Sequence, residues 1–338
     1  MHTARQSHTA TSLPDGKVLV TGGQGSTFTA VNSAELFDPV AQTWTTTTNN
    51  MNFARQYHTA SVLSDGKVLV TGGLGSGGTV LNSAELFDPV AQTWAITTNN
   101  MNVARQYHTA SVLSDGKVLV TGGADSSSNA LNSAELFDPV AQTWTTTTNN
   151  MNVARFGHTA SVLSDGKVLV TGGQGSGSTV LNSAELFDPV AQTWTTATNN
   201  MNFARTAHTA SVLSDGKVLV TGGQGSTFTA VNSAELFDPV AQTWTTTTNN
   251  MNLARAAHTA SVLSDGKVLV TGGQGSGGTV LNSAELFDPV AQTWTTTTNN
   301  MNVARQYHTA SVLSDGKVLG AGGSYGYSLL VETECYIP

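Results

Sequence analysis

The chain repeats itself every 50 residues, and this period constrains its fold more than any other feature. The words ARQYHTASVLSDGKVLVTGG occupy residues 54–73, and close copies begin at Ala4, Ala104, Ala154, Ala204, Ala254 and Ala304. A period of this length must be read before domains are counted. One 50-residue unit buries too little core to be stable alone, so neighbouring units must stabilise one another by packing. We therefore predict one domain over 1–338, built from repeats 1–50, 51–100, 101–150, 151–200, 201–250, 251–300 and a partial 301–338.

Each unit is predicted to contain four β-strands. In the second unit, 58–63 and 67–73 flank Ser-Asp-Gly, and Asp-Gly between apolar runs is a strong hairpin signal. Residues 83–88 form a third predicted strand, and a Thr-rich fourth strand opens at 93–94 and ends at an Asn pair. No segment shows helical periodicity. We call these strands A, B, C and D in every unit.

The apolar run of strand B indicates how the units are arranged. Val68, Leu69 and Val70 follow one another without a polar residue, which is typical of a strand buried on both faces. A ring of stacked sheets buries both faces and leaves only short exposed edges. The pair Gly72-Gly73 would let a neighbouring sheet come close. A straight β-solenoid is the rival architecture, although its coils are usually shorter. The sequence therefore predicts an all-β, seven-bladed propeller of four-stranded antiparallel blades.

Three features carry a resemblance to a known repeat. They are the Gly-Gly that closes strand B (Gly22-Gly23), the aromatic residue before Asp-Pro (Phe37) and a Trp five residues after that proline (Trp44). These residues resemble the kelch repeat, and the resemblance covers the whole chain. Kelch repeats form β-propellers, so the resemblance also implies seven blades.

The last unit departs from the pattern. It lacks the Trp and strand D, and Cys335-Tyr336-Ile337-Pro338 replaces Leu-Phe-Asp-Pro. We expect a last blade without its outer strand, and a ring held closed by packing between blades. The open edge could accept a strand from another chain. Otherwise we expect a monomer.

Composition excludes several functions. Only 11% of the residues are charged, the net charge is −8, and Lys and Arg number 14, or one of each per unit. No basic stripe for nucleic acid is present. No apolar stretch approaches the roughly 18 residues that span a membrane, and no signal-peptide pattern precedes the first unit, so the compartment stays unassigned. The single cysteine, Cys335, excludes an intrachain disulfide. The chain starts in mid-pattern, as an excised piece of a longer protein would.

Two places vary between the copies: the pair of residues after each Arg, and the stretch after Gly-Gly. Strand direction alternates within a blade, so the D–A and B–C loops that hold these places should emerge on one face. Binding residues concentrate on loops carried by a rigid scaffold, although loops also drift by default. The candidate ligand-binding residues on this face are Tyr57, Tyr107, Phe156, Tyr307, Arg55, Arg105, Arg305, Phe28 and Phe228.

A histidine begins strand A in every unit, and these residues should form a ring around the central channel. Histidine is the commonest metal ligand, so a copper or zinc site is one hypothesis. The favoured hypothesis is a structural role, in which each imidazole bonds to a neighbouring backbone group. We therefore expect no cofactor. The histidines are His8, His58, His108, His158, His208, His258 and His308.

The arginine before each histidine also has two interpretations. Its planar guanidinium suits an acidic ligand. We favour instead a framework role in which each arginine pairs with a glutamate of strand C, such as Glu35 or Glu85. The tryptophans are expected to be packing anchors between blades.

A second resemblance concerns the Tyr-His pairs at 57–58, 107–108 and 307–308. They resemble the copper-binding stretch of galactose oxidase and its relatives, in which Tyr and His bind copper and another Tyr is joined to a Cys. Here the only cysteine is Cys335, on a C strand, and no accessory domain is present.

The sequence therefore favours a non-enzymatic scaffold that binds a peptide or carbohydrate. A copper-dependent oxidase is the alternative. Residues 24–50 recur letter for letter at 224–250, which indicates recent duplication or deliberate construction.

Overall fold

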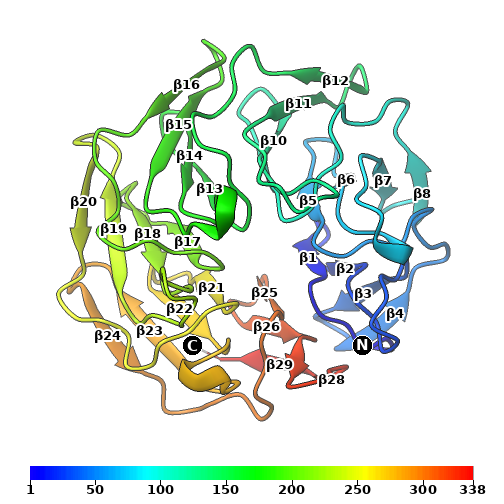
Figure 1. The fold of residues 1–338 in the computed structure, drawn as a ribbon. Helices are drawn as coiled ribbons and strands as arrows, with labels where there is room; N and C mark the ends of the chain where they lie inside the picture. The colour runs from blue at the N-terminus through cyan, green and yellow to red at the C-terminus, as the bar shows by residue number, and fades with distance from the viewer. Residues whose placement is uncertain (338) are drawn as a thin grey trace.

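The strand and turn signals of each unit produce one antiparallel sheet, and seven such sheets surround a central channel (Figure 1). The computed structural model describes residues 1–337. The units follow one another counter-clockwise in Figure 1, and we number the blades 1 to 7 in that order. Six blades have four strands and the last has three. The predicted all-β, seven-bladed propeller is confirmed, including the missing outer strand.

Strands A and B form the inner half of every blade. The A strands line the channel and are β1 (Thr9–Ser12), β5 (Thr59–Val62), β9 (Thr109–Val112), β13 (Thr159–Val162), β17 (Thr209–Val212), β21 (Thr259–Val262) and β25 (Thr309–Val312). The B strands are β2 (Val18–Thr21), β6 (Val68–Thr71), β10 (Val118–Thr121), β14 (Val168–Thr171), β18 (Val218–Thr221), β22 (Val268–Thr271) and β26 (Val318–Ala321).

Strands C and D form the outer half. The C strands are β3 (Ala34–Asp38), β7 (Ala84–Asp88), β11 (Ala134–Asp138), β15 (Ala184–Asp188), β19 (Ala234–Asp238), β23 (Ala284–Asp288) and β29 (Thr333–Tyr336). The D strands are β4 (Thr43–Thr46), β8 (Thr93–Ile96), β12 (Thr143–Thr146), β16 (Thr193–Thr196), β20 (Thr243–Thr246) and β24 (Thr293–Thr296).

The Asp-Gly signal between strands A and B forms a three-residue hairpin loop. In blade 2 the Leu63 N–H donates to the Lys67 carbonyl at 2.8 Å, and the Gly66 N–H donates to the Leu63 carbonyl at 3.0 Å. Gly66 has a φ of 84°, the left-handed conformation that the last residue of such a loop requires and that glycine adopts at no steric cost.

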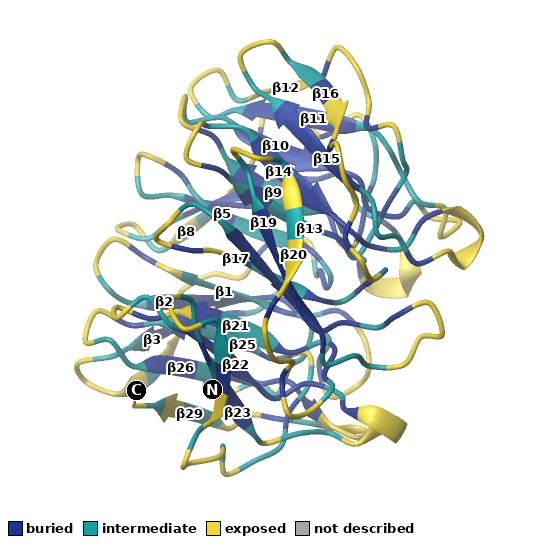
Figure 2. Ribbon diagram, turned by 90° about the vertical axis from the view of Figure 1, so that its left-hand side faces the viewer, coloured by how far each residue is buried: buried dark blue, intermediate teal, exposed yellow. Residues whose placement is uncertain are grey.

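The hydrophobic core lies between blades. All four residues of each complete B strand are buried, as the unbroken apolar run predicts. One cluster joins Leu69 and Leu86 of blade 2 to Val120, Phe137 and Trp144 of blade 3. Figure 2 shows these buried strands between exposed loops. The tryptophans therefore anchor one blade to the next, as expected.

The two glycines that close strand B meet the next blade at very close range. A Cβ placed on Gly72 would lie 2.6 Å from the Arg105 carbonyl oxygen. The Gly73 N–H donates to that same oxygen at 2.8 Å. Glycine is required because any side chain would push the blades apart and break this hydrogen bond.

Blades 7 and 1 are joined by the same backbone hydrogen bonds as all the other neighbouring blades, and these bonds close the ring. The Gly323 N–H of blade 7 donates to the Arg5 carbonyl of blade 1 at 2.8 Å, as Gly73 does to Arg105. The Arg5 N–H donates in return to Leu330 at 3.3 Å. The prediction named packing between blades alone, and the structure adds these main-chain hydrogen bonds.

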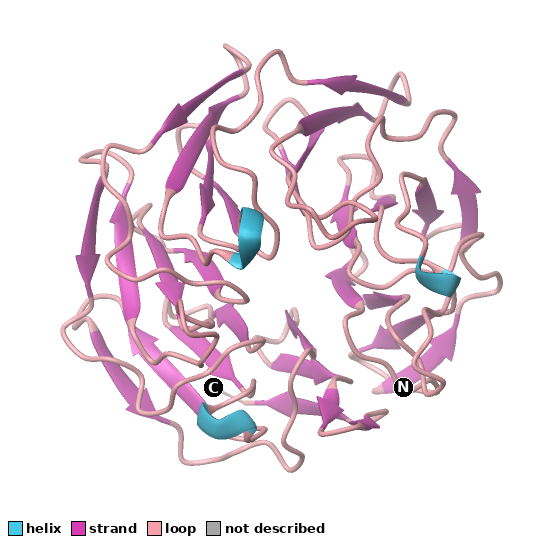
Figure 3. Ribbon diagram, viewed as in Figure 1, coloured by secondary structure: helices cyan, strands magenta, loops and turns pink. Residues whose placement is uncertain are grey.

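Blade 7 also contains a small hairpin that the sequence did not predict, formed by β27 (Ser324–Tyr325) and β28 (Ser328–Leu329). Helical structure in residues 1–337 is limited to three 3₁₀ turns in B–C loops: η1 (Ser76–Gly78), η2 (Ser176–Ser178) and η3 (Ser276–Gly278) (Figure 3). None of the helical turns in this part of the chain is long and apolar enough to cross a membrane.

Candidate functional site

Both variable loops lie together on one face of the ring. In blade 2, Gln56 of the D–A loop forms a β-bridge with Leu74, and Leu74 forms another with Val80 on the return of the B–C loop. The turns of constant sequence meet on the other side, where Pro39 of a C–D turn and Asp315 of an A–B turn line one cavity of about 370 Å³. We call the side with the D–A and B–C loops the variable face.

A closed ring of backbone hydrogen bonds encircles the channel on this face. It uses the second residue after each arginine, whose N–H donates to the carbonyl of its counterpart in the preceding blade at 3.0–3.3 Å. All seven residues have a positive φ, between 50° and 59°. The members of this ring, in order, are Ser7, Tyr57, Tyr107, Gly157, Ala207, Ala257 and Tyr307.

The side chains on this backbone ring divide it into two halves. Tyr57 and Tyr107 stack with ring centroids 4.1 Å apart, and Phe156, next in the chain to Gly157, lies 6.1 Å from Tyr107. Tyr307 belongs to the same side, because only Ser7 separates it from Tyr57 in the ring. We call these four aromatic residues the aromatic arc. The opposite half carries only Gly157, Ala207 and Ala257.

Stacking of Tyr57 on Tyr107 covers part of the surface of both side chains. Tyr107 is 38% exposed and Tyr307 is 42% exposed. Burial, and then the nearby Tyr57 phenol, raises the pKa of both hydroxyls. These phenols therefore remain neutral donors and acceptors at physiological pH.

The two phenylalanines of the B–C loops lie apart from each other. Phe28 is 54% exposed in blade 1, which also contributes Ser7 between two tyrosines of the arc. Phe228 is 44% exposed in blade 5, whose ring residue is Ala207. A small polar hollow of about 150 Å³ lies between the B–C loops of blades 3 and 4 and is lined by Phe156 and Gln174.

The arginines form buried ion pairs inside each blade. The Arg55 Nη2 lies 2.8 Å from Glu85 Oε1, and both side chains are fully buried. Arg55 also donates to the Gly72 and Ser83 carbonyls at the ends of strands B and C. The framework role is therefore the one that the geometry supports.

Burial also decides whether the arginines that were predicted to contact a ligand can reach one. Arg55, Arg105 and Arg305 have no exposed side-chain surface. They pair with Glu85, Glu135 and Glu334, respectively. These three arginine side chains therefore form no part of the exposed surface of the variable face.

The histidines point between blades. His58 Nε2 is hydrogen-bonded to the hydroxyls of Thr9 and Thr21 in blade 1, both at 3.1 Å, and these hydroxyls are 2.7 Å apart. His58 is only 6% exposed. The ring nitrogen therefore bonds to threonine hydroxyls of the preceding blade and not to the neighbouring backbone group that was predicted.

The channel environment keeps these histidines neutral. Burial, and then the charge of Arg105, lowers the pKa of His108 to about 3. His208 and His308 have the same value for the same reason, and the other four histidines shift in the same direction. The residues following the histidines, such as Thr9 and Ala10, line the open channel volume of about 520 Å³ with them.

The orientation of the histidines also bears on metal binding. The Nε2 atoms of six histidines each bond to a pair of threonines, and that of His8 bonds to Thr309 alone. The seven imidazoles therefore do not converge and do not fit one copper or zinc ion. Within residues 1–337, no three His, Cys, Asp or Glu side chains are grouped to hold a metal ion. Cys335 lies beside Phe37 and Leu313, close to the constant turns.

One histidine lacks a threonine partner that the other six have. His8 Nε2 bonds to Thr309 at 2.9 Å, but Ala321 occupies the place that Thr21 has in blade 1. We expect Ala321→Thr to raise the free energy of unfolding by about 1 kcal/mol, since it supplies a buried hydrogen bond. Urea denaturation would measure this gain. Ala321→Val, which adds similar volume without a hydroxyl, is the control, and equal stability of the two variants would contradict the assignment.

Comparison with known proteins agrees with this architecture. The model of the KLHDC2/KLHL20/DRC7 Kelch-repeats domain matches residues 1–173 and again 107–323. No curated protein matches the chain in sequence. A solved structure with a similar fold is a novel fungal alcohol oxidase of the AA5 family in complex with copper. It has a TM-score of 0.74 and 20% identity, over 95% of this chain and 70% of the oxidase.

An identity of 20% shows a shared fold and does not transfer the oxidase's chemistry. The family match covers nearly the whole chain in two overlapping registers, as expected for a repeat. Gly-Gly, the aromatic residue before Asp-Pro and the Trp all occupy the packing positions described above. The chain belongs to the Kelch-repeat family.

Proposed function

We propose that this propeller is a non-enzymatic scaffold that binds a peptide or a carbohydrate on its variable face, over the aromatic arc. Tyrosine supplies a large contact area with few rotatable bonds and retains a polar hydroxyl. The arc offers three such side chains and a phenylalanine around one half of the channel mouth. The small residues of the other half leave room for the rest of a ligand.

The backbone of the arc supports a role beyond folding. Tyr57, Tyr107 and Tyr307 hold a φ between 52° and 55°, and a bulky residue at positive φ is an outlier that costs free energy. Gly157 holds the same place at no such cost, and Ser7 shows that a small polar residue also completes the ring. Strain retained at three positions that tolerate smaller residues is typical of a binding site.

The test compares ligand capture by two matched proteins. The variant Tyr57→Ser/Tyr107→Ser/Tyr307→Ser installs the residue that blade 1 already carries in the ring. We expect it to stay folded, with unchanged circular dichroism, because the backbone hydrogen bonds do not depend on these side chains. A printed glycan array and a random-peptide phage library would supply the probes. Ligands of the parent should bind the variant at least about tenfold more weakly, a difference of about 1.4 kcal/mol.

The control lies on the opposite face. Val90 and Val140, in the constant C–D turns, are 95% and 94% exposed. The variant Val90→Ser/Val140→Ser should bind every ligand as the parent does. If ligands bind the tyrosine variant as tightly as the parent, or bind the valine variant more weakly, the binding site lies elsewhere on the molecule. If the parent binds no ligand at all, the proposal is contradicted.

The alternative function is a copper-dependent oxidase. It is supported by the fold shared with the copper-bound alcohol oxidase and by the three Tyr-His pairs. Oxygen uptake in the presence of Cu²⁺ and a primary alcohol would establish it. The engagement of each histidine by threonines makes the binding scaffold the better supported function.

A further inference from the structure

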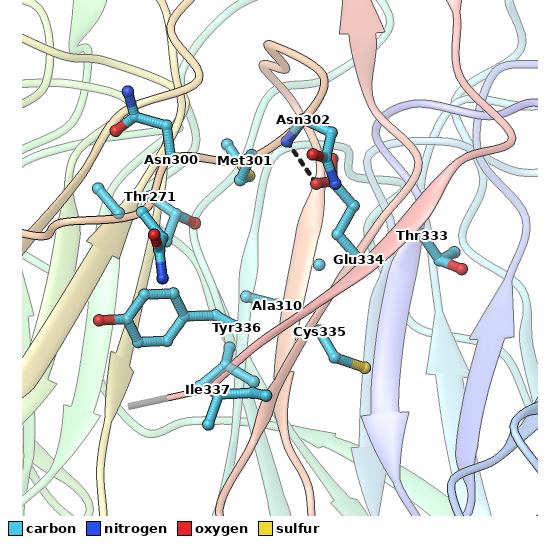
Figure 4. A pocket seen from close by; sticks show the side chains of 14 residues that line it. Thr271, Asn300, Met301, Asn302, Ala310, Thr333, Glu334, Cys335, Tyr336 and Ile337 are labelled. Carbon is cyan, nitrogen blue, oxygen red and sulfur yellow. Dashed lines mark hydrogen bonds between the residues drawn. The ribbon is translucent and has the colours of Figure 1, made fainter.

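Blade 7 leaves a cavity of about 430 Å³ between itself and blade 6 (Figure 4). The cavity is lined on one side by Ala284 of blade 6 and on the other by Val318, Gly320 and Tyr336 of blade 7, with Met301 from the connecting segment. Its volume falls within the range of small-ligand pockets, roughly 300–1,000 Å³.

The same place is filled with side chains between blades 2 and 3. There Ala84 and Met101 pack with Val118, Val120, Phe137 and Trp144 in one cluster, and the last of these belongs to strand D. In blade 7 the counterpart of Val120 is Gly320, and Tyr336 stands in the place of Phe137. The cavity therefore corresponds to the space that one tryptophan and one valine side chain, Trp144 and Val120, fill in blade 3.

The outer edge of β29 is open beside this cavity. In blade 3, β12 pairs with β11 and sets Trp144 opposite Phe137 and Thr145 opposite Leu136. Thr147 also donates its N–H and its hydroxyl to the Ala134 carbonyl. Among residues 1–337 no strand pairs with the outer edge of β29, and Cys335 on that strand is exposed.

We propose that this edge is a strand-binding site that takes an extended segment of a separate chain, with a tryptophan flanked by threonines. The segment adds antiparallel to β29 as a fourth strand, and its indole enters the cavity against Tyr336. Main-chain bonds along an edge supply affinity and a side-chain pocket supplies specificity. The chemistry of the occupant follows from the six complete blades, which all place Thr-Trp at this point.

The site is independent of the variable face. Its cavity is lined by residues of strands, by the segment 299–302 and by Ile337, none of which belongs to the aromatic arc. Failure of this proposal would therefore leave the proposed function unaffected.

The direct test uses a labelled peptide with the sequence of residues 138–148, DPVAQTWTTTT. Fluorescence anisotropy with the 338-residue protein should show saturable binding. A peptide with Trp144→Ala should bind at least about tenfold more weakly, because a buried aromatic side chain contributes more than the 1.4 kcal/mol that tenfold requires. No anisotropy change, or equal binding of both peptides, would overturn the proposal.

Two substitutions at one position give the matched protein control. A Cβ on Gly320 would approach no atom more closely than 3.8 Å, so both variants should fold. Gly320→Val restores the residue of the complete blades and should retain peptide binding. Gly320→Phe should occupy the cavity itself and weaken binding at least about tenfold. Equal affinity of the phenylalanine variant would contradict insertion of the indole.

Cys335 provides a test of register. If the peptide adopts the pairing of blade 3, the counterpart of Thr145 lies opposite Cys335, where Cβ atoms are about 5 Å apart. A peptide with Thr145→Cys should form a disulfide with Cys335 in glutathione buffer, in which oxidised glutathione accepts the two electrons. A peptide with Thr143→Cys should react several-fold less, and equal yields would exclude the assigned register.

Discussion

Lowering the pH from 7 to 5 is expected to unfold this propeller. The pKa values of His108, His208 and His308 are about 3, and that of unfolded histidine is about 6.5. Below pH 6.5 the unfolded chain therefore binds protons that the folded ring excludes. The contribution of these histidines to stability is fully present above about pH 6.5 and is lost as the pH falls towards 3.

The size of the effect follows from the number of histidines. Each contributes about 1.4 kcal/mol per pH unit within this window. The pKa values of all seven channel histidines shift in the same direction. The free energy of unfolding lost by pH 5 is therefore on the order of 10 kcal/mol, comparable to the whole stability of a typical domain. Urea midpoints measured by tryptophan fluorescence at half-unit steps between pH 7 and pH 5 would record it.

The control for the acid effect is the eighth histidine. His2 is exposed and lies outside the ring, so His2→Gln removes a histidine without removing one from the channel. His208→Gln should reduce the slope by about one-seventh, since it removes one buried group. A stability that stays constant between pH 7 and pH 5 would show that the folded ring accepts protons.

Local signals explain why the fold could be predicted. The Asp-Gly turn, the apolar B strand and the Gly-Gly pair each depend on the chemistry of a few adjacent residues. The arginine was also placed correctly in its framework role, because one arginine and one strand C glutamate accompany each other in the first six units. Seven copies of each signal in one register then leave little choice of architecture.

The contacts between blades could not be predicted in the same way. His58 bonds to Thr9 and Thr21, which lie 49 and 37 residues earlier in the chain. Near-identical units conceal whether a partner belongs to the same unit or to the preceding one. The backbone ring of the variable face was missed for another reason. Only Gly157 among its seven members signals a positive φ, and Tyr, Ser and Ala do not.

Removing one buried glutamate is expected to destabilise the propeller by about 3–5 kcal/mol, because a buried charge loses its partner. In Glu85→Ala, Arg55 would remain fully buried without its counter-charge. The N–H groups of Asn52 and Phe53 would also lose their acceptor, since Glu85 binds them at 2.6 and 3.1 Å. Urea denaturation at pH 7.5, above the histidine window, would measure the loss.

Three further variants separate the ion pair from its hydrogen bonds. Glu332 is exposed, and Glu332→Ala should change stability by less than about 0.5 kcal/mol. Glu334→Ala should cost less than Glu85→Ala, because Glu334 is 15% exposed and water can replace it. The double variant Arg55→Met/Glu85→Leu removes both charges, yet it leaves the Gly72 carbonyl and two N–H groups unpaired and removes one of the two donors to the Ser83 carbonyl. We therefore expect it to be no more stable than Glu85→Ala. Recovery to the parent's stability would show that charge alone is at stake, and that these side chains do not fasten the D–A loop to its blade.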